Sequence, residues 1–346
     1  MREPLDAAPP TPLTEDDLVA TIRRVVAGDA PGVLLGVGDD AALVEAGRPG
    51  SVVILTTDAL VEGVHFDRSG TSPRDLGHKA VAVNVSDVAA MGGGPLYALV
   101  ALAVPPTVEP AWIVDLYGGM RAACESYGCS LVGGDLSRSS EIFVSVTVLG
   151  EVAAGRAVRR SGARPGDAIV VTGVLGAAAG GLVLARASAP VAADAASAGW
   201  GHDLLVALDR PEARVGEGET LAQAGATAMI DLSDGLARDL GRLCAESRVG
   251  ARVRLADVPV ADQLERLAVA VPGVDPLTLA LSGGEDYELL ATLPAGAVED
   301  AAASLIERFG VPLRAIGEIV EDGGLVALEP DGRERPLMPE GWDHFA

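Results

Sequence analysis

Apolar runs of strand length and of helix length follow one another along this chain without regular alternation. A doubly wound parallel sheet would need strict alternation, so the order favours an α+β architecture. The chain has 346 residues, which is long for one core and sufficient for two such domains. We expect strands at 51–57, 96–104, 129–132, 142–149, 167–172, 287–293 and 314–320, helices at 14–22, 76–91, 109–127, 176–187, 220–224, 236–247 and 301–309, and a loop at 190–201.

The character of the sequence changes between residues 153 and 166, where Arg and Gly become frequent. We interpret this segment as the crossing from one domain to the next. The sequence therefore predicts an N-terminal domain over 14–155 and a C-terminal α+β domain over 156–346. Residues 1–13 are rich in Pro and Ala and are predicted to form a disordered lead.

Charge and composition exclude several classes of protein. The formal net charge of −23 argues against a nucleic-acid partner, which needs a basic face. The chain lacks an apolar stretch of about 18 uncharged residues and an apolar signal-peptide segment, so we expect no membrane span and a cytoplasmic location. Its cysteines form no C-x-x-C pair, which suits a reducing compartment. Lys79 is the single lysine and precedes Ala80, so a standard P-loop is absent.

Short motifs rich in Gly and Asp carry most of the candidate chemistry. An aspartate beside glycine is usually a turn residue, so each motif taken singly is weak. Asp58 and Asp135 are predicted to follow strands, where α/β proteins gather functional residues. The motifs are Gly36-Val-Gly-Asp-Asp40, Thr56-Thr-Asp58, Asn84-Val-Ser-Asp87, Gly133-Gly-Asp135, Asp231-Leu-Ser-Asp-Gly235 and Ser282-Gly-Gly-Glu-Asp286.

The expected helix over 76–91 places Asn84 and Asp87 three positions apart, on one face. The rest of that helix is mostly apolar, and a buried carboxylate is costly there unless it is paired or binds a metal. Asp231 and Asp234 lie at a predicted helix start, where N-capping is the alternative to cation binding. Oxygen ligands without a Cys or His cluster favour Mg²⁺ over Ca²⁺ or Zn²⁺. Because Mg²⁺ takes few carboxylates per ion, clustering of these motifs would imply several ions.

Glycine pairs and two arginines are candidates for phosphate contacts. Gly133-Gly134 and Gly283-Gly284 let the backbone approach a ligand closely. Gly173-Val-Leu-Gly176 joins a predicted strand to a helix, where either helix N–H groups meet a phosphate or a plain turn forms. Arg159 and Arg160 would form either a phosphate clamp or a solvated linker pair.

These motifs resemble those of the thiamine-monophosphate kinases. The family belongs to a wider group with aminoimidazole ribotide synthetase and selenophosphate synthetase. The resemblance implies a two-domain α+β ATP-binding fold and a dimer in which the N-terminal domains pair their sheets. The matching pieces keep their order and lengths from Gly36 to the C-terminus: GVGDDAAL, TTDALVEGVHF, KAVAVNVSDVAAMG, LVGGD, RRSGARPGD, IDLSDGLARDL, LSGGEDYEL and GWDHF.

The resemblance also implies roles for the matching residues. Magnesium ions would be held by Asp40, Thr56, Thr57, Asp58, Asp87, Asp135, Asp231 and Asp234. ATP would contact Gly134, Asp135, Arg160 and Ser233, and thiamine monophosphate would contact His65, Glu285 and Trp342. The catalytic set would be Asp58, Asp87, Asp135 and Asp234. Without the resemblance, His65 is better explained as a structural histidine and Trp342 as a packing residue, and Asp39 is the alternative to Asp40.

The implied activity is transfer of a phosphoryl group from ATP to thiamine monophosphate, with several Mg²⁺ ions. The acceptor phosphate has a second pKa of about 6, so it needs no general base and transfer is expected to be direct and in line. Two alternatives remain: another ATP-dependent enzyme of the wider group, of the cyclo-ligase or selenophosphate synthetase type, and a nucleotide-binding regulator without turnover. The selenophosphate synthetase type would be expected to carry a reactive Cys near its N-terminus, and none precedes Cys124.

Overall fold

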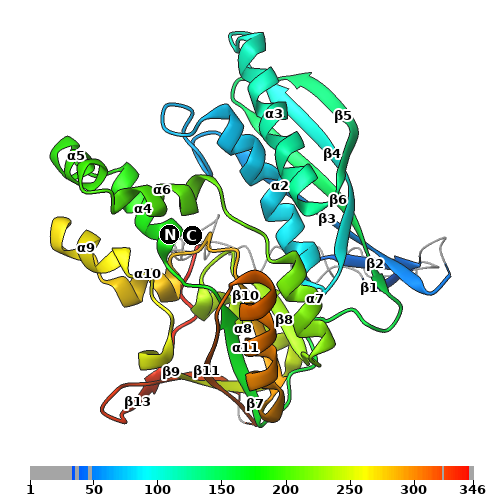
Figure 1. The fold of residues 1–346 in the computed structure, drawn as a ribbon, viewed down its shortest axis with the longest axis vertical. Helices are drawn as coiled ribbons and strands as arrows, with labels where there is room; N and C mark the ends of the chain where they lie inside the picture. The colour runs from blue at the N-terminus through cyan, green and yellow to red at the C-terminus, as the bar shows by residue number, and fades with distance from the viewer. Residues whose placement is uncertain (1–32, 36–38, 46–48, 322, 343–346) are drawn as a thin grey trace, which may run out of the picture.

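The computed structural model of the chain describes residues 33–35, 39–45, 49–321 and 323–342. Within these residues the strands form two sheets that have no strand in common, and helices pack against both (Figure 1). The α+β class expected from the sequence is confirmed. The expected disordered lead over 1–13 and the expected helix over 14–22 lie outside the described residues.

The N-terminal sheet has six strands in the order β1-β2-β3-β6-β4-β5. Its neighbours run antiparallel except β4 and β5, which are parallel and are joined through α3. Helices α2 and α3 cover one face of the sheet (Figure 1). The elements are β1 (Val33–Leu35), β2 (Ala42–Glu45), β3 (Ser51–Val61), α2 (Pro73–Ala90), β4 (Gly94–Val104), α3 (Pro110–Tyr127), β5 (Ser130–Arg138) and β6 (Phe143–Ala153).

Helix α2 lies between the two halves of the molecule and contacts both. The Ser72 hydroxyl caps its N-terminus by accepting a hydrogen bond from the Asp75 N–H at 3.1 Å. Every residue from Leu76 to Ala90 is buried except Asp87, which is partly exposed. A helix that is apolar on nearly all sides suits this central place. It therefore carries its few polar side chains into the interior.

The C-terminal sheet has seven strands in the order β13-β12-β9-β11-β7-β10-β8. Alternate residues of its central strands face two separate apolar layers, one with α8 and α10 and one with α7 and α11. The elements are β7 (Asp167–Thr172), α4 (Ala177–Ala185), α5 (Ala189–Ser197), α6 (Gly201–Asp209), α7 (Val215–Gln223), β8 (Ala228–Asp231), α8 (Leu236–Ser247), β9 (Gly250–Arg254), α9 (Gln263–Ala270), α10 (Pro276–Ser282), β10 (Leu289–Pro294), α11 (Val298–Phe309), β11 (Leu313–Val320), β12 (Gly324–Leu328) and β13 (Glu334–Pro336).

The segment 190–201 is helical over most of its length, so the loop expected there was wrong. Ser188 precedes α5 as its N-cap residue, and proline takes a place in the first turn, where its missing N–H does no harm. The following alanines are the strongest helix formers. Tertiary packing adds to this preference, because Ala195 is buried beside Leu184 and Trp200 in an apolar cluster.

Two strands run further than expected, which corrects the setting of two predicted site residues. Asp58 and Asp135 lie within β3 and β5 rather than after them. β3 continues because β6 pairs with it along its whole length. β5 continues because Gly133-Gly134 stay paired with β4 instead of turning away. The sequence also did not predict β1, β2, β8, β9, β12, β13, α6, α9 or α10.

Among the helices of the described residues, none combines the length and the apolar character that crossing a membrane requires.

Candidate active site

A cavity of about 380 Å³ opens between the two halves of the molecule, beside helix α2. Its wall combines side chains of β3 and α2 with residues from the loops that follow β8 and α10. The predicted site residues that line it are Asp40, Thr56, Thr57, Asp58, His65, Asp87, Arg160, Asp231, Ser233, Asp234, Glu285 and Trp342.

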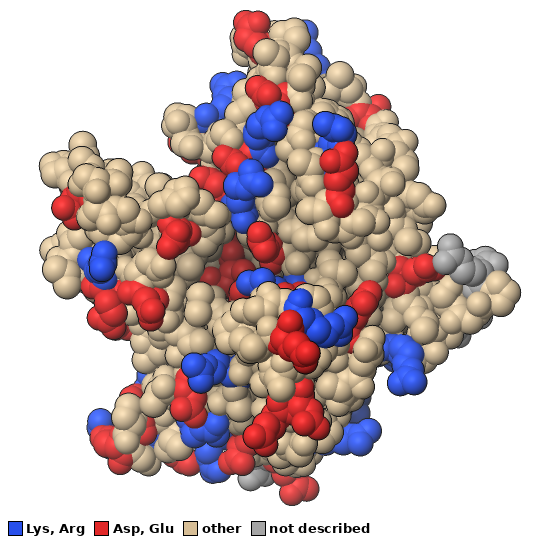
Figure 2. Space-filling model, viewed as in Figure 1, with Lys and Arg blue, Asp and Glu red and all other residues tan. Residues whose placement is uncertain are grey.

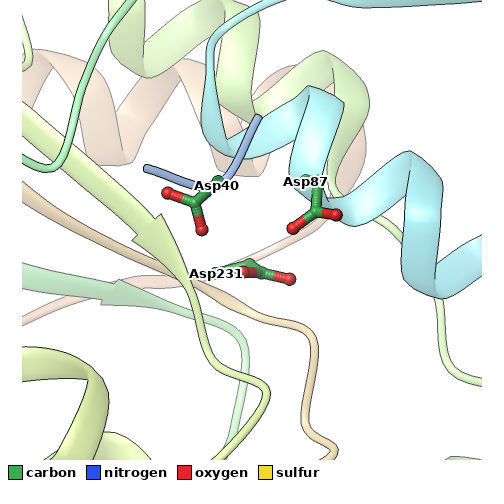
Figure 3. A group of neighbouring side chains, drawn as sticks. All are labelled: Asp40, Asp87 and Asp231. Carbon is green, nitrogen blue, oxygen red and sulfur yellow. The ribbon is translucent and has the colours of Figure 1, made fainter. Parts of the chain in front are cut away.

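Three carboxylates converge at one end of this cavity. Asp40, Asp87 and Asp231 each place one oxygen within 4.8 Å of the others, around the common space shown in Figure 3. Asp40 precedes β2, Asp87 lies on α2 and Asp231 ends β8. The three residues are far apart in the sequence, so only the packing of α2 between the two sheets brings them together.

Protein hydroxyl groups orient two of these carboxylates. Thr56 Oγ1 of β3 donates a hydrogen bond of 2.5 Å to Asp87 Oδ2. Ser86 Oγ, from the next position on α2, donates one of 2.7 Å to Asp231 Oδ2. Hydrogen bonds to an ionised group are among the stronger ones. The carboxylates are thus positioned before any ligand arrives.

The cluster is electrostatically unfavourable by itself. Burial raises the pKa of Asp87 well above its usual range, and the charges of Asp58, Asp231 and Asp40 raise it further. Burial also raises the pKa of Asp231, with Asp40 as the next cause. Buried carboxylates that face one another stay ionised only where positive charge compensates them. Oxygen ligands in this setting fit a hard divalent cation such as Mg²⁺.

Arg160 supplies part of the compensating charge. Its guanidinium donates two hydrogen bonds of 2.8 Å, one to each oxygen of Asp40. The neighbouring Asp39 accepts the Arg160 backbone N–H instead, and burial followed by the charge of Asp40 raises the pKa of Asp39 to about 7. Of the two adjacent aspartates, Asp40 is the one in the carboxylate cluster. Arg159 is exposed and does not line the cavity in the described part of the chain.

The segment Thr56 to Asp58 presents alternate residues to opposite faces of β3. Thr56 and Asp58 face α2, and the Asp58 N–H donates to Asn84 Oδ1 at 2.8 Å. Thr57 points to the other face, where its hydroxyl donates to a carbonyl of β6 at 3.0 Å. Asn84 and Asp87 share a face of α2, as expected, and Asn84 fixes that helix against β3.

Asp135 and Gly134 lie away from the cavity. Asp58, Val146, Val100 and Gly134 occupy one row across β3, β6, β4 and β5, so strands about 4.8 Å apart put Gly134 roughly 14 Å from Asp58. Asp135 is exposed, and Ser137 Oγ donates to it at 2.9 Å. A Cβ at Gly134 would lie 1.8 Å from the Val100 carbonyl oxygen, so strand packing alone requires this glycine.

Two loops of the C-terminal half cross where they form the cavity wall. The Glu285 N–H donates to the Ser233 carbonyl at 2.7 Å, and the Tyr287 N–H donates to the Leu232 carbonyl at 2.9 Å. Glu285 and Tyr287 have φ angles of 60° and 50°, in the left-handed region that non-glycine residues rarely adopt. Such strain persists only where surrounding contacts impose it, and it is concentrated at functional sites.

Asp234 connects this wall to the end of the described chain. Its carboxylate accepts a hydrogen bond of 2.5 Å from Arg242, and its carbonyl accepts the Trp342 N–H at 3.1 Å. The Arg238 guanidinium donates to the Trp342 carbonyl. The Trp342 side chain is 47% exposed at the cavity mouth. The start of α8 is held by Asp239, whose carboxylate accepts the Asp234 N–H, so the N-cap alternative for Asp231 and Asp234 is wrong.

Two other sequence features are held by hydrogen bonds within the chain. His65 Nδ1 accepts the Val61 N–H at 3.0 Å, which leaves the proton of a neutral ring on Nε2. At the start of α4, the Asp286 carboxylate accepts the Gly176 N–H at 2.9 Å. This helix terminus is therefore satisfied from within the chain, which supports the plain turn over a phosphate site.

Several cavity residues were not predicted as site residues. They include Lys79, Arg186, Asp209, Arg242 and Tyr287. Lys79 could have been suspected from its being the single lysine. Tyr287 lies in the matching piece LSGGEDYEL, whereas Arg186, Asp209 and Arg242 follow no motif and only the tertiary structure places them at the cavity. On the face drawn in Figure 2, acidic and basic side chains are interspersed, and acidic ones also lie in the hollow between the two halves.

Family models cover most of the chain. Residues 38–152 match the model described as "AIR synthase related protein, N-terminal domain", and residues 164–328 match "AIR synthase related protein, C-terminal domain". The thiamine-monophosphate kinase of Escherichia coli K12 is 39% identical over 335 residues, which are 96% of this chain and 98% of that protein. The thiamine-monophosphate kinase of Bacillus subtilis 168 is 36% identical over 314 residues, or 90% and 93% of the two chains.

Solved structures agree with these matches. A structure described as AaThiL complexed with AMPPCP and TMP aligns with a TM-score of 0.82 and 34% identity, over 96% of this chain and 97% of the other. A thiamine-monophosphate kinase from Stenotrophomonas maltophilia aligns with a TM-score of 0.73 and 37% identity, over 92% and 95%. The hydrogenase maturation protein HypE in complex with ATP shares the fold, with a TM-score of 0.67 and 24% identity.

Proposed function

The chain belongs to the thiamine-monophosphate kinases of the AIR synthase related family, and from this we propose that it transfers the γ-phosphoryl group of ATP to the phosphate of thiamine monophosphate. The products are thiamine diphosphate and ADP. The observation that carries the proposal is the alignment, over 96% of this chain, with a relative bound to AMPPCP and TMP. The carboxylate-lined cavity supports it independently, because bringing two phosphates together requires a concentration of cations.

We propose that Asp40, Asp87 and Asp231 hold Mg²⁺, with Thr56 and Asp58 beside them. When bound, the cations supply charge neutralisation for the phosphates of both substrates. The fit rests on the convergence of one oxygen from each of the three carboxylates within 4.8 Å, and burial together with the neighbouring carboxylates raises the pKa of Asp87 and Asp231. The further metal-ligand roles of Thr57, Asp135 and Asp234 are part of the same proposal.

For ATP, Arg160 and Ser233 are the proposed contacts within the cavity. Arg160 is oriented by its two hydrogen bonds to Asp40, so its remaining N–H groups have a defined direction. For the acceptor, we propose His65, Glu285 and Trp342, which line the same cavity. The acceptor phosphate attacks directly, since its oxygens are already largely ionised at neutral pH.

We also propose a homodimer formed through the outer face of the N-terminal sheet. This face is the one turned away from α2, and it exposes Tyr97, Leu99 and Phe143. Asp135 lies on the same face. It pairs with Ala101 of β4, and successive residues of a strand point to opposite faces, so Ala101 points away from the face on which its neighbour Val100 is buried. The ATP and metal roles of Gly134 and Asp135 stay predictions. A monomeric mass by light scattering at micromolar concentration would contradict the dimer.

We also propose that the two domains divide between residues 155 and 156. β6 ends at Ala153 and β7 begins at Asp167, so the proposed boundary falls between the last strand of one sheet and the first of the other. The cytoplasmic location stays a prediction.

The proposed function is tested by incubating the purified protein with ATP, Mg²⁺ and thiamine monophosphate, and following ADP and thiamine diphosphate. We expect both products in equal amounts and no labelled protein from γ-³²P-ATP. Parallel assays replace thiamine monophosphate with selenide or with the substrate of a cyclo-ligase of the wider group. Turnover with either of these alone would favour the other enzymes of the wider group, and nucleotide binding without any ADP would favour a regulator.

A further inference from the structure

Lys79 is an unusual residue in this chain. Of 26 lysine and arginine residues it is the single lysine, and its side chain is only 2% exposed. Lysine is almost never fully buried unless it is paired. Where arginine serves at every other basic position, a buried lysine indicates a site that needs a compact ammonium rather than a planar guanidinium.

Helix α2 connects Lys79 to the carboxylate cluster. Lys79, Val83 and Asp87 follow one another at intervals of four residues, and all three line the cavity. At about 1.5 Å per residue, Lys79 lies roughly 12 Å along the helix from Asp87. One face of α2 therefore runs along the cavity, with the carboxylate cluster at one end and the Lys79 ammonium group at the other.

The ammonium is held by two acceptors from different segments. Nζ donates to the Leu208 carbonyl at 3.0 Å and pairs with Glu285 Oε1 at 2.8 Å. The carboxylate of Asp209, at the end of α6, is the next charge to face it, and Thr71 Oγ1 donates to that carboxylate at 2.9 Å. Lys79 is therefore a fixed group, which cannot swing into the cavity without breaking both contacts.

Glu285 is constrained at both its backbone and its side chain. Its φ angle of 60° is imposed by the hydrogen bond to the Ser233 carbonyl, and its carboxylate is tied to Lys79. A buried ion pair is weak evidence for stability, because desolvation offsets most of the attraction. Such a pair is better explained by what it orients. With one oxygen tied to Lys79, the other oxygen of Glu285 has a defined direction.

We propose that Lys79 is a positioning residue for the acceptor substrate: it holds the Glu285 carboxylate in the orientation that binds thiamine monophosphate. The inference rests on the proposed function. A carboxylate fixed in this way can accept an N–H from the amino group of the acceptor pyrimidine. Lys79 acts through Glu285, so its loss should weaken acceptor binding more than it slows phosphoryl transfer.

Kinetics of Lys79→Met test the proposal. We expect the KM for thiamine monophosphate to rise about ten- to thirty-fold, as for loss of a hydrogen bond to a charged group. The KM for ATP should stay within twofold and kcat within threefold. Arg121→Met is the matched control, because it removes a cation that is 74% exposed on α3, and it should leave all three constants unchanged. Equal rises in both KM values, or none, would overturn the proposal.

A measurement on the unmutated protein avoids any effect of Lys79→Met on folding. Because the chain has one lysine, protein labelled with ¹³C at lysine Cε gives a single lysine signal in NMR. We expect thiamine monophosphate to move this signal when AMPPCP and Mg²⁺ are already present. A signal that stays in place at saturating acceptor would overturn the proposal. Failure of wild-type protein to phosphorylate thiamine monophosphate would instead overturn the proposed function, so the two failures are distinguishable.

Discussion

The two ends of the cavity differ in how their negative charges are balanced. At one end, Asp40, Asp87 and Asp231 bring negative charge together with Arg160 as the partner cation. At the other end, the Glu285 charge is balanced within the protein by Lys79. The first end is incomplete until cations bind, whereas the second is complete before any ligand arrives. Residues at the first end should therefore govern the rate of transfer, and those at the second should govern acceptor binding.

The carboxylate end gives the largest expected effect. Asp87→Asn should lower kcat by about a hundred-fold or more, the scale seen when a charge stabiliser of the transition state is removed. Because burial, and then the charges of the neighbouring aspartates, raise the pKa of Asp87, removing its charge should leave the metal-free protein as stable as before or more so. Asp115→Asn, on the exposed side of α3, is the matched control. A normal kcat in Asp87→Asn would contradict the view that the carboxylate end governs the rate of transfer.

Removal of the metal tests the same end without a mutation. Excess EDTA should abolish turnover, because the clustered carboxylates then repel the phosphates. Added Mg²⁺ should restore it, since hard oxygen ligands exchange the ion readily. Thermal unfolding of the EDTA-treated protein should still be cooperative, because neither sheet contributes its core to the cluster. Full activity in chelator would contradict the metal assignment.

The pH dependence of stability should report on the carboxylate end. Burial raises the pKa of Asp87 and Asp231, so their folded forms bind protons more tightly than the unfolded chain does. The stability they contribute is therefore present at acid pH and is lost as pH rises through the raised pKa values. We expect the metal-free protein to melt at lower temperature at pH 8 than at pH 6, and Mg²⁺ to offset more of the loss at pH 8. A pH-independent effect of Mg²⁺ would count against the cluster.

Trp342 gives the smallest effect and sharpens the assignment of the acceptor end. Its indole is 47% exposed at the cavity mouth, where it can stack on the thiazolium cation of the acceptor. Such cation–π contacts contribute roughly 0.5–2 kcal/mol, so Trp342→Ala should raise the KM for thiamine monophosphate about three- to thirty-fold. The KM for ATP should change little, and Trp342→Phe should recover much of the loss. A matching rise in the KM for ATP would identify Trp342 as a structural anchor.

The sequence predicted more of the candidate site than of the fold around it. Asp40, Asp87 and Asp231 stand in short motifs that could be recognised one by one, and they meet in the structure. The strands that were missed are short or lie at sheet edges, where local preference is weak and pairing decides. The sequence predicts Asp58 and Asp135 just after strands, whereas both lie within strands. Threonine beside Asp58 and glycine beside Asp135 do not show where pairing with the neighbouring strand ends.

By itself the sequence determined the residue types: oxygen ligands in Gly/Asp motifs, an apolar central helix and a single lysine. These follow from local chemistry, since ligand type, helix burial and composition are properties of short segments. Only the tertiary structure decided which of these residues meet. In the structure Asp40 rather than Asp39 lies in the cluster, and Asp135 lies on the outer face of a sheet. Lys79 forms an ion pair with Glu285. Such contacts join distant segments, and they depend on how α2 packs between two sheets rather than on any pattern near the residues themselves.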